Sequence, residues 1–106
     1  AVAAWKAVLR SLPPPGGPGP EITAGDFNAT LDHRELRRVL DRGWRDAADA
    51  VGAGLRPTWP VGRRIFGIAI DHVLAGPGLG VHRYGIRSIP GTDHRAVVAE
   101  LVPRAG

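Results

Sequence analysis

Polar side chains suited to phosphate or cation chemistry stand at the ends of apolar, strand-like segments of this sequence. Asp26 and Asn28 end the first such segment, in "ITAGDFNAT", residues 22–30. Both residue types are poorly suited to a strand, and the simplest explanation is a turn, where Gly, Asp and Asn are common. The alternative is a site that these two side chains form with residues from elsewhere in the chain.

Two further segments fit that alternative. Asp71 lies within the apolar run "IAIDHVL", where an ionised carboxylate is costly unless it is paired, hydrogen-bonded or bound to a metal. Asp93 and His94 stand in "GTDHRAV", directly before the last apolar segment. Because ligands gather at strand ends in sheet-based enzymes, we expect these polar groups to lie close together. Carboxylate, amide and imidazole groups without sulfur favour a hard cation such as Mg²⁺.

Each of these residues also has a structural interpretation. Turn chemistry accounts for Asp26 and Asn28. Hydrogen bonds to backbone amides account for Asp71, and an exposed loop accounts for Asp93 and His94. Taken singly, these interpretations compete with the site. The functional hypothesis therefore depends on the three segments meeting.

The composition is that of a soluble globular domain with an excess of positive charge. The 106 residues are 43% hydrophobic and 23% charged, with a formal net charge of +4. A positive field favours anionic partners such as nucleic acid or phosphate esters. Without cysteine, disulfides and thiolate metal sites are excluded. No apolar run approaches the roughly 20 residues of a membrane span, and the missing initiator Met suggests a piece of something longer.

A first helix is predicted near the start of the chain. Its apolar residues are spaced i, i+3, i+4 and i+7, which is typical of an amphipathic helix over residues 3–12. These residues are Trp5, Val8, Leu9 and Leu12. The prolines at 13–15 must end this helix, and the Pro/Gly-rich segment 13–20 is expected to be a loop.

A second helix is predicted over residues 31–43. We expect Asp32 to be its N-cap, Glu35 to complete a capping box, and Gly43 to close it. Capping explains Asp32 fully, so it is assigned a structural role. A further helical turn is expected within residues 44–54. The buried face of the second helix should consist of Leu36, Val39 and Leu40.

Four strands are predicted around these helices. Residues 21–25 indicate a short buried strand that delivers the first aspartate at its carboxyl end. The apolar, β-branched run 65–76 suits a strand covered on both faces. Residues 81–89 are expected to pair with it across the turn at 76–80, and residues 95–102 form the last strand. The result is an α/β arrangement whose sheet is covered by helices. Four strands and two helices are few for a complete domain, which suggests half of a larger one.

The motifs "GDFNAT", "IDHVL" and "GTDHRAVVAEL" resemble the endonuclease/exonuclease/phosphatase superfamily in type, order and spacing. Thr58 and Trp59 precede the second motif, as they often do in that family, and are expected to support the site by packing. The resemblance implies metal-dependent hydrolysis of phosphate esters by a phosphodiesterase, nuclease or phosphatase. The cation it implies is Mg²⁺ or Mn²⁺.

The resemblance covers nearly all of this chain but only part of the family domain. Members are about twice as long, and their N-terminal half supplies a metal-binding glutamate and a further histidine. Glu21 is wrongly placed to be that glutamate. The resemblance therefore implies that residues 1–106 form the C-terminal half of a sheet-on-sheet sandwich flanked by helices, with a mixed, largely antiparallel sheet. By itself such a fragment should lack a complete metal site and be inactive.

The resemblance also assigns roles by motif. Asp26 would orient or deprotonate the attacking water and contact the metal, and Asn28 would hold that nucleophile and contact the phosphate. Asp71 would hydrogen-bond His94, so that the other ring nitrogen faces the substrate phosphate. Asp93 would approach the metal or its waters. One departure from the family pattern is Ala96, which replaces a proline common two residues after the histidine.

Other charged residues are expected to be less specific. Solvated charge explains three arginines better than substrate contact does: Arg63, Arg64 and Arg95. Three histidines should lie on the surface or pack locally: His33, His72 and His82. Successive strand positions would send His72 to the opposite face from its acidic neighbour.

The sequence leaves the substrate and the setting open. "RPTWP" and "IPGTDHRAVVAEL" look like a bacterial subgroup that is anchored in the membrane with its catalytic domain outside. Such an enzyme would act on lipid-linked phosphate esters, which competes with a nuclease role; otherwise the protein would be cytoplasmic. A different class of function is a non-catalytic interaction module that retains the motifs. The expected partners are the missing N-terminal half and, through an exposed sheet face, a second copy.

Overall fold

A computed structural model describes residues 2–17, 19–54, 56–59 and 69–104, with the backbone alone for 2–5. It confirms a mixed α/β fold with few helices. The elements follow the chain in this order: α1 (Val2–Ser11), β1 (Ile22–Asp26), α2 (Arg34–Asp41), β2 (Arg45–Asp46), α3 (Ala47–Ala50), β3 (Asp71–Ala75), β4 (Leu79–Ser88) and β5 (Arg95–Pro103). None of the described helices is long and apolar enough to cross a membrane.

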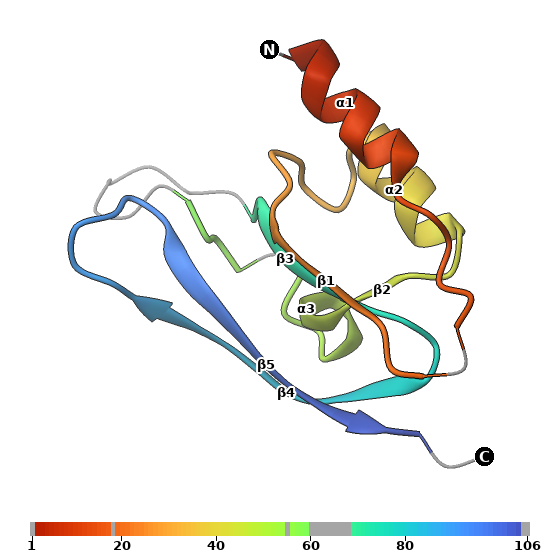
Figure 1. Cartoon of the computed structure of the whole chain (residues 1–106). Helices are drawn as coiled ribbons and strands as arrows, with labels where there is room; N and C mark the ends of the chain where they lie inside the picture. The colour runs from red at the N-terminus through yellow and green to blue at the C-terminus, as the bar shows by residue number, and fades with distance from the viewer. Residues whose placement is uncertain (1, 18, 55, 60–68, 105–106) are drawn as a thin grey trace.

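The strands form two antiparallel groups within the described residues. One is a three-stranded sheet in the order β1–β3–β2, and the other is the β4–β5 hairpin. Figure 1 shows α1 and α2 on one side of the sheet and the hairpin running along the other. The predicted pairing of residues 65–76 with 81–89 is wrong. Since β1 and β2 occupy both edges of β3, the chain turns at Gly76–Leu79 and β4 pairs with β5 instead.

The helices pack on the sheet through one hydrophobic core. Leu36 and Val39 of α2 are almost completely buried, as predicted, and Leu40 packs beside them. Val8 of α1 is 62% exposed although it belongs to the predicted stripe. The core cluster consists of Leu9, Phe27, Ala29, Leu36, Val39, Trp44 and Leu74.

The start of α2 differs from its prediction. His33, not Asp32, is the N-cap, and its Nδ1 accepts a hydrogen bond from the Glu35 amide at 3.2 Å. Asp32 instead accepts a hydrogen bond from the Thr30 hydroxyl in the preceding turn. Glu35 does not form a capping box, because its carboxylate pairs with Arg10 of α1 at 3.0 Å. The helix ends as predicted, with Gly43 at a positive φ of 118°.

The two strands that carry the first aspartates also differ from their predictions. β1 is formed as expected, but four of its five residues are exposed, so the prediction of a buried strand is wrong. Its outer edge has no strand partner within the described residues. β3 is buried from His72 to Ala75 as predicted, but Asp71 begins the strand and does not lie in its middle. Residues 65–68 of the predicted strand lie outside the described residues.

Candidate functional site

The pairing of β1 with β3 places two carboxylates opposite one another. Asp26 ends β1, Asp71 begins β3, and the two are direct partners in the antiparallel register. Like charges in this position repel each other. His94, immediately before β5, compensates for that repulsion. Its Nδ1 lies 2.9 Å and 3.2 Å from the two oxygens of Asp71, and its Nε2 lies 3.7 Å from Asp26 Oδ2.

The protonation of His94 follows from these partners. A carboxylate only accepts hydrogen bonds, so Nδ1 carries a proton and donates it to Asp71. This hydrogen bond is the main reason that the pKa of His94 is raised; partial burial opposes it, and the charges of Asp71, Asp26 and Asp93 add to it. The raised pKa favours the imidazolium form. The ring therefore offers Nε2–H on the same side as the Asp26 carboxylate.

Thr58 connects the backbones that hold this pair. Its side chain is fully buried, and its Oγ1 accepts hydrogen bonds from the amides of Ile70 and Asp71 at 3.0 Å and 3.2 Å. Its carbonyl accepts the Arg95 amide at 2.7 Å. The start of β3 and the start of β5 are thereby fixed to one residue. The predicted support by Thr58 is achieved by hydrogen bonds.

Trp59 contacts the exposed side of the site. Its indole N–H donates to Asp93 Oδ2 at 2.9 Å, and its ring lies 6.3 Å from the His94 ring at a tilt of 42°. Asp93 Oδ1 is 4.0 Å from His94 Nε2, and the Asp93 side chain is 65% exposed. Trp59 thus holds Asp93 close to His94 while leaving one of its carboxylate oxygens open.

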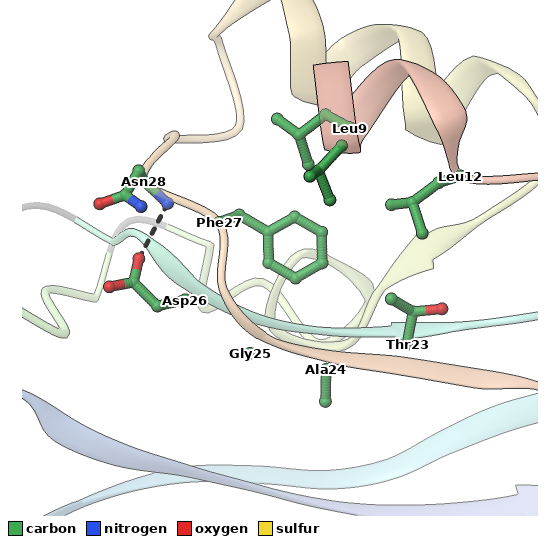
Figure 2. Close-up of a pocket in the computed structure, with 9 residues that line it drawn as sticks. Leu9, Leu12, Thr23, Ala24, Gly25, Asp26, Phe27 and Asn28 are labelled. Carbon is green, nitrogen blue, oxygen red and sulfur yellow. Dashed lines mark hydrogen bonds between the residues drawn. The ribbon is translucent and has the colours of Figure 1, made fainter. Parts of the chain in front are cut away.

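Asn28 combines turn chemistry with a place beside the site. Its backbone amide donates to Asp26 Oδ1 at 2.8 Å, and its own φ is 52°, in the left-handed region that Asn tolerates better than most residues. The preceding amide, of Phe27, donates to the Ile70 carbonyl at 2.8 Å. The interpretation of Asp26 and Asn28 as turn residues is therefore correct. The turn also keeps the exposed Asn28 side chain beside the Asp26 carboxylate (Figure 2).

Three of the five predicted site residues meet directly, and the other two lie next to them in the chain or in space. One ligand atom from each of Asp26, Asp71 and His94 falls within 4.8 Å of the others. Asp71 is engaged by His94 Nδ1 through both its oxygens. Asp26, Asp71 and His94 are therefore the described residues that could hold a cation, and the Asp93 carboxylate stands beside them, with its Oδ1 4.0 Å from His94 Nε2. Carboxylate oxygens fit a hard cation. The described residues do not fill the octahedral shell that Mg²⁺ prefers.

An apolar hollow of about 260 Å³ lies between α1 and β1. Figure 2 shows Leu9, Leu12 and Phe27 around it, while the Asp26 carboxylate points away. The hollow adjoins the site but does not contain its chemistry.

Two acidic residues outside the motifs have clear roles. Glu21 is far from the site, at the opposite end of β1 from Asp26. Its carboxylate accepts hydrogen bonds from the amides of Gly16 and Gly17 at 3.0 Å and 2.7 Å, which organises the Pro/Gly-rich loop.

Asp46 is 2% exposed and its Oδ1 lies 2.9 Å from His72 Nδ1. Sequence reasoning did not identify this buried pair.

The other basic residues contribute no direct contact to the site within the part of the chain that the structure describes. Arg95 donates from its guanidinium to the Pro57 carbonyl at 3.4 Å, and His82 is exposed on β4. Arg63 and Arg64 lie outside the described residues. His72 lies on the opposite face of β3 from Asp71, as predicted, and at 3% exposed it packs locally, which is the second of the two positions expected for it. A polar histidine within an apolar strand was the one sign in the sequence that His72 has a buried hydrogen-bond partner.

Comparisons with known proteins agree with this geometry. A sequence profile of the Endonuclease/Exonuclease/phosphatase family matches residues 3–94. Among solved structures, the chain is similar to a mannosyl-6-phosphatase of Bacteroides thetaiotaomicron VPI-5482, with a TM-score of 0.64 and 24% sequence identity. The match covers 95% of this chain and 42% of that one, so the chain spans less than half of the length of this relative. No curated protein matches the sequence.

Proposed function

Because the chain belongs to the endonuclease/exonuclease/phosphatase family, we propose that the protein carrying it hydrolyses phosphate esters at the site of Asp26, Asp71 and His94. The family is one of phosphoester hydrolases. The observation that carries the proposal is the position of His94. Its Nδ1 is held by Asp71 at 2.9 Å, while its Nε2 faces the open side next to Asp26.

In this proposal His94 stabilises the negative charge on the phosphoryl group. An imidazolium fixed before the reaction needs little reorganisation when charge develops in the transition state. Asp71 keeps the ring in one orientation and favours its charged form. The side-chain amide of Asn28 contacts a second phosphate oxygen. Trp59 fixes Asp93 at the rim of the same site.

Asp26 activates the attacking water. Its Oδ1 accepts the Asn28 amide, which leaves Oδ2 to accept a hydrogen bond from water. The water oxygen forms a bond to phosphorus, its proton passes to Asp26, and the P–O ester bond breaks. The departing oxygen takes a proton from solvent. The products are an alcohol and a phosphate with one ester bond fewer.

The carboxylates of Asp26 and Asp93 would hold a divalent cation, Mg²⁺ or Mn²⁺. When bound, such a cation neutralises charge on the phosphate. Its remaining ligands would come from water and from a part of the protein beyond this chain. We therefore expect the 106 residues alone to bind the cation weakly and to hydrolyse little or nothing.

We also propose that this chain is the C-terminal half of its domain. Three facts support this: the chain spans 42% of the solved relative, the strand that carries Asp26 is exposed, and large apolar side chains on β1 and β5 face solvent. These side chains are Ile22, Val98 and Val102. The missing half would cover them and complete the metal site.

The test measures turnover of the full-length protein with Mg²⁺ on bis(p-nitrophenyl) phosphate, a diester, and p-nitrophenyl phosphate, a monoester. Asp26→Asn and His94→Gln should each lower kcat by about 10²–10⁴-fold, the range of general acid–base catalysis. The matched controls are Asp41→Asn and His82→Gln, which change exposed residues elsewhere and should leave kcat unaltered. Unchanged turnover in both site variants would exclude these roles. No turnover by the wild-type full-length protein would instead favour a non-catalytic interaction module.

A further inference from the structure

A buried histidine lies beneath the candidate site and takes no part in the chemistry proposed above. His72 follows Asp71 in β3, and its side chain is only 2% exposed. Its ring packs edge-on against Phe27, with centroids 5.6 Å apart and planes at 82°. A polar ring in a hydrophobic core is costly unless both of its nitrogens have partners. Both do.

The two partners of His72 come from opposite sides of the ring. Nδ1 lies 2.9 Å from Asp46 Oδ1, and Nε2 lies 2.7 Å from the Ala29 carbonyl oxygen. A carbonyl oxygen only accepts hydrogen bonds, so Nε2 carries a proton and donates it to Ala29. The ring therefore forms a bridge from β2 to the turn that follows β1.

The Asp46 end of this bridge is firmly held. Asp46 is the N-cap of α3, where its Oδ2 accepts the Asp49 amide at 2.9 Å. It also sits in β2, where it is the register partner of Leu74 in β3. With a side chain that is 1% exposed, Asp46 has little freedom to move. Through His72, the Ala29 carbonyl is therefore connected to the firmly held Asp46.

The Ala29 end of the bridge is the part of the chain that places Asn28. Asn28 has a positive φ of 52°, a conformation that L-residues adopt only at some cost and that surrounding contacts must maintain. Its amide contact to Asp26 holds the turn on one side. The buried Ala29 carbonyl, bound by His72, holds it on the other.

We propose that His72 is a positioning residue for the turn Asp26–Ala29. By binding the Ala29 carbonyl it fixes the position of Asn28, which in the proposed function contacts the water and the phosphate. This inference rests on the function proposed above. A displacement of about 1 Å in a group that orients substrate lowers turnover by as much as 10²-fold, so a contact outside the site can have a catalytic effect.

Two substitutions at His72 separate positioning from general stability. His72→Gln places an amide N–H near the position of Nε2 and retains a donor to Ala29. His72→Asn is shorter, places its N–H near the position of Nδ1, and retains only the contact to Asp46. Asp46→Asn is a third variant, since Asn is also a good N-cap and accepts a hydrogen bond from the ring.

In the full-length protein with Mg²⁺, we expect His72→Asn to lower kcat for the diester on the order of 10–10²-fold with KM little altered. His72→Gln should restore most of the lost kcat, and Asp46→Asn should have the smaller effect. If His72 contributed only to stability, both His72 variants would have a smaller folded fraction, and the kcat of the folded protein would not differ between them. Equal kcat in the Asn and Gln variants would overturn the proposal.

Hydrogen exchange tests the positioning without any activity. In His72→Asn the backbone amide of Asn28 should exchange faster while the amide of Leu74, a fully buried residue of β3 opposite Thr23 in β1, keeps its protection. His72→Gln should restore protection at Asn28. Loss of protection at both amides, or at neither, would contradict the proposal. If the wild-type protein hydrolyses no phosphate ester, the proposed function fails, and the exchange data still decide whether His72 fixes the turn.

Discussion

Two hydrogen-bonded neighbours, β1 and β3, have opposite environments. In β3 the residues from His72 to Ala75 are buried, and Ala75 is 1% exposed. Its register partner Ile22 in β1 is 56% exposed. A strand in the middle of a sheet is covered by its own chain, whereas β1 has one edge and much of one face open. The comparison shows that this chain holds the β3 side of the candidate site firmly in place. It leaves the β1 side, which carries Asp26, largely uncovered.

The same contrast holds for the two carboxylates of the candidate site. The Asp71 side chain is 13% exposed, hydrogen-bonded to His94 and supported by Thr58 through its amide. The Asp26 side chain is 39% exposed and supported mainly by its own turn. The Asp71–His94 pair is therefore complete within this chain. The side proposed to bind the water and the cation is not.

The largest expected effect sharpens this contrast through two acidic residues that flank His94. Asp71→Asn should lower kcat of the full-length protein by about 10²–10⁴-fold at any Mg²⁺ concentration, because the orientation and charge of the ring are lost. Asp93→Asn should raise the Mg²⁺ concentration needed for half-maximal rate and be largely corrected by excess Mg²⁺. Titrations of rate against Mg²⁺ for both variants test this. A defect in Asp71→Asn that excess Mg²⁺ repairs would contradict the distinction.

The stability of the two regions should differ in a similar way. Leu36→Ala removes a side chain that is 0% exposed and should cost about 2–5 kcal/mol of unfolding free energy. Ile22→Ala in the 106-residue chain should change the unfolding free energy by only about 0.5 kcal/mol, as exposed substitutions do. In the full-length protein, where we expect Ile22 to be covered, its cost should rise. Urea unfolding of each pair gives these values, and an equal, small cost of Ile22→Ala in both proteins would argue against a covering half.

The open side should also govern association. At high concentration the 106-residue chain should form dimers or larger species through its exposed apolar side chains. Ile22→Lys combined with Val98→Lys should shift it toward the monomer, because it places charge on the two most exposed apolar positions of β1 and β5. Sedimentation velocity measures the distribution. A wild-type chain that stays monomeric at high concentration would show that these side chains do not drive association.

The smallest effect concerns the ion pair between α1 and α2. The hydrogen bond from Arg10, opposed by burial and aided by positive charge, lowers the pKa of Glu35 in the folded state. The unfolded state therefore binds more protons in acid, so this stabilisation is present above the unfolded pKa of about 4.3 and is lost as pH falls. Glu35→Gln should flatten the acid side of the stability–pH curve only slightly, because Arg10 is 56% exposed.

Urea unfolding at a series of pH values measures that curve. The matched control is Asp41→Asn, which neutralises an exposed carboxylate at the other end of the same helix. If Glu35→Gln changes the acid side of the curve no more than this control does, the ion pair contributes nothing to stability.

The sequence predicted the residues of the site better than the architecture around them. Asp26, Asp71 and His94 were identified because charged groups at strand ends need partners, and the structure brings the three together. Both main helices and the last two strands were also expected. These features depend on local spacing and on residue chemistry, which a sequence displays directly.

The errors concern partners that are distant in the chain or absent from it. The pairing of β4 with β5 depends on both edges of β3 being occupied, and β2, with only two residues, gave no strand signal. On our proposal, β1 is exposed because the half of the domain that would cover it is not part of these 106 residues. The Asp46–His72 pair joins positions 26 residues apart, and nothing in the sequence near Asp46 indicates its partner.

The most direct measurement is an experimental structure of the full-length protein with inorganic phosphate and Mg²⁺. The account predicts a phosphate oxygen within about 3 Å of His94 Nε2, a hydrogen-bonding distance, with Asp71 still bound to Nδ1 and the cation on Asp26 or Asp93. Phosphate and cation bound elsewhere, or a His94 ring turned away from Asp71, would contradict it.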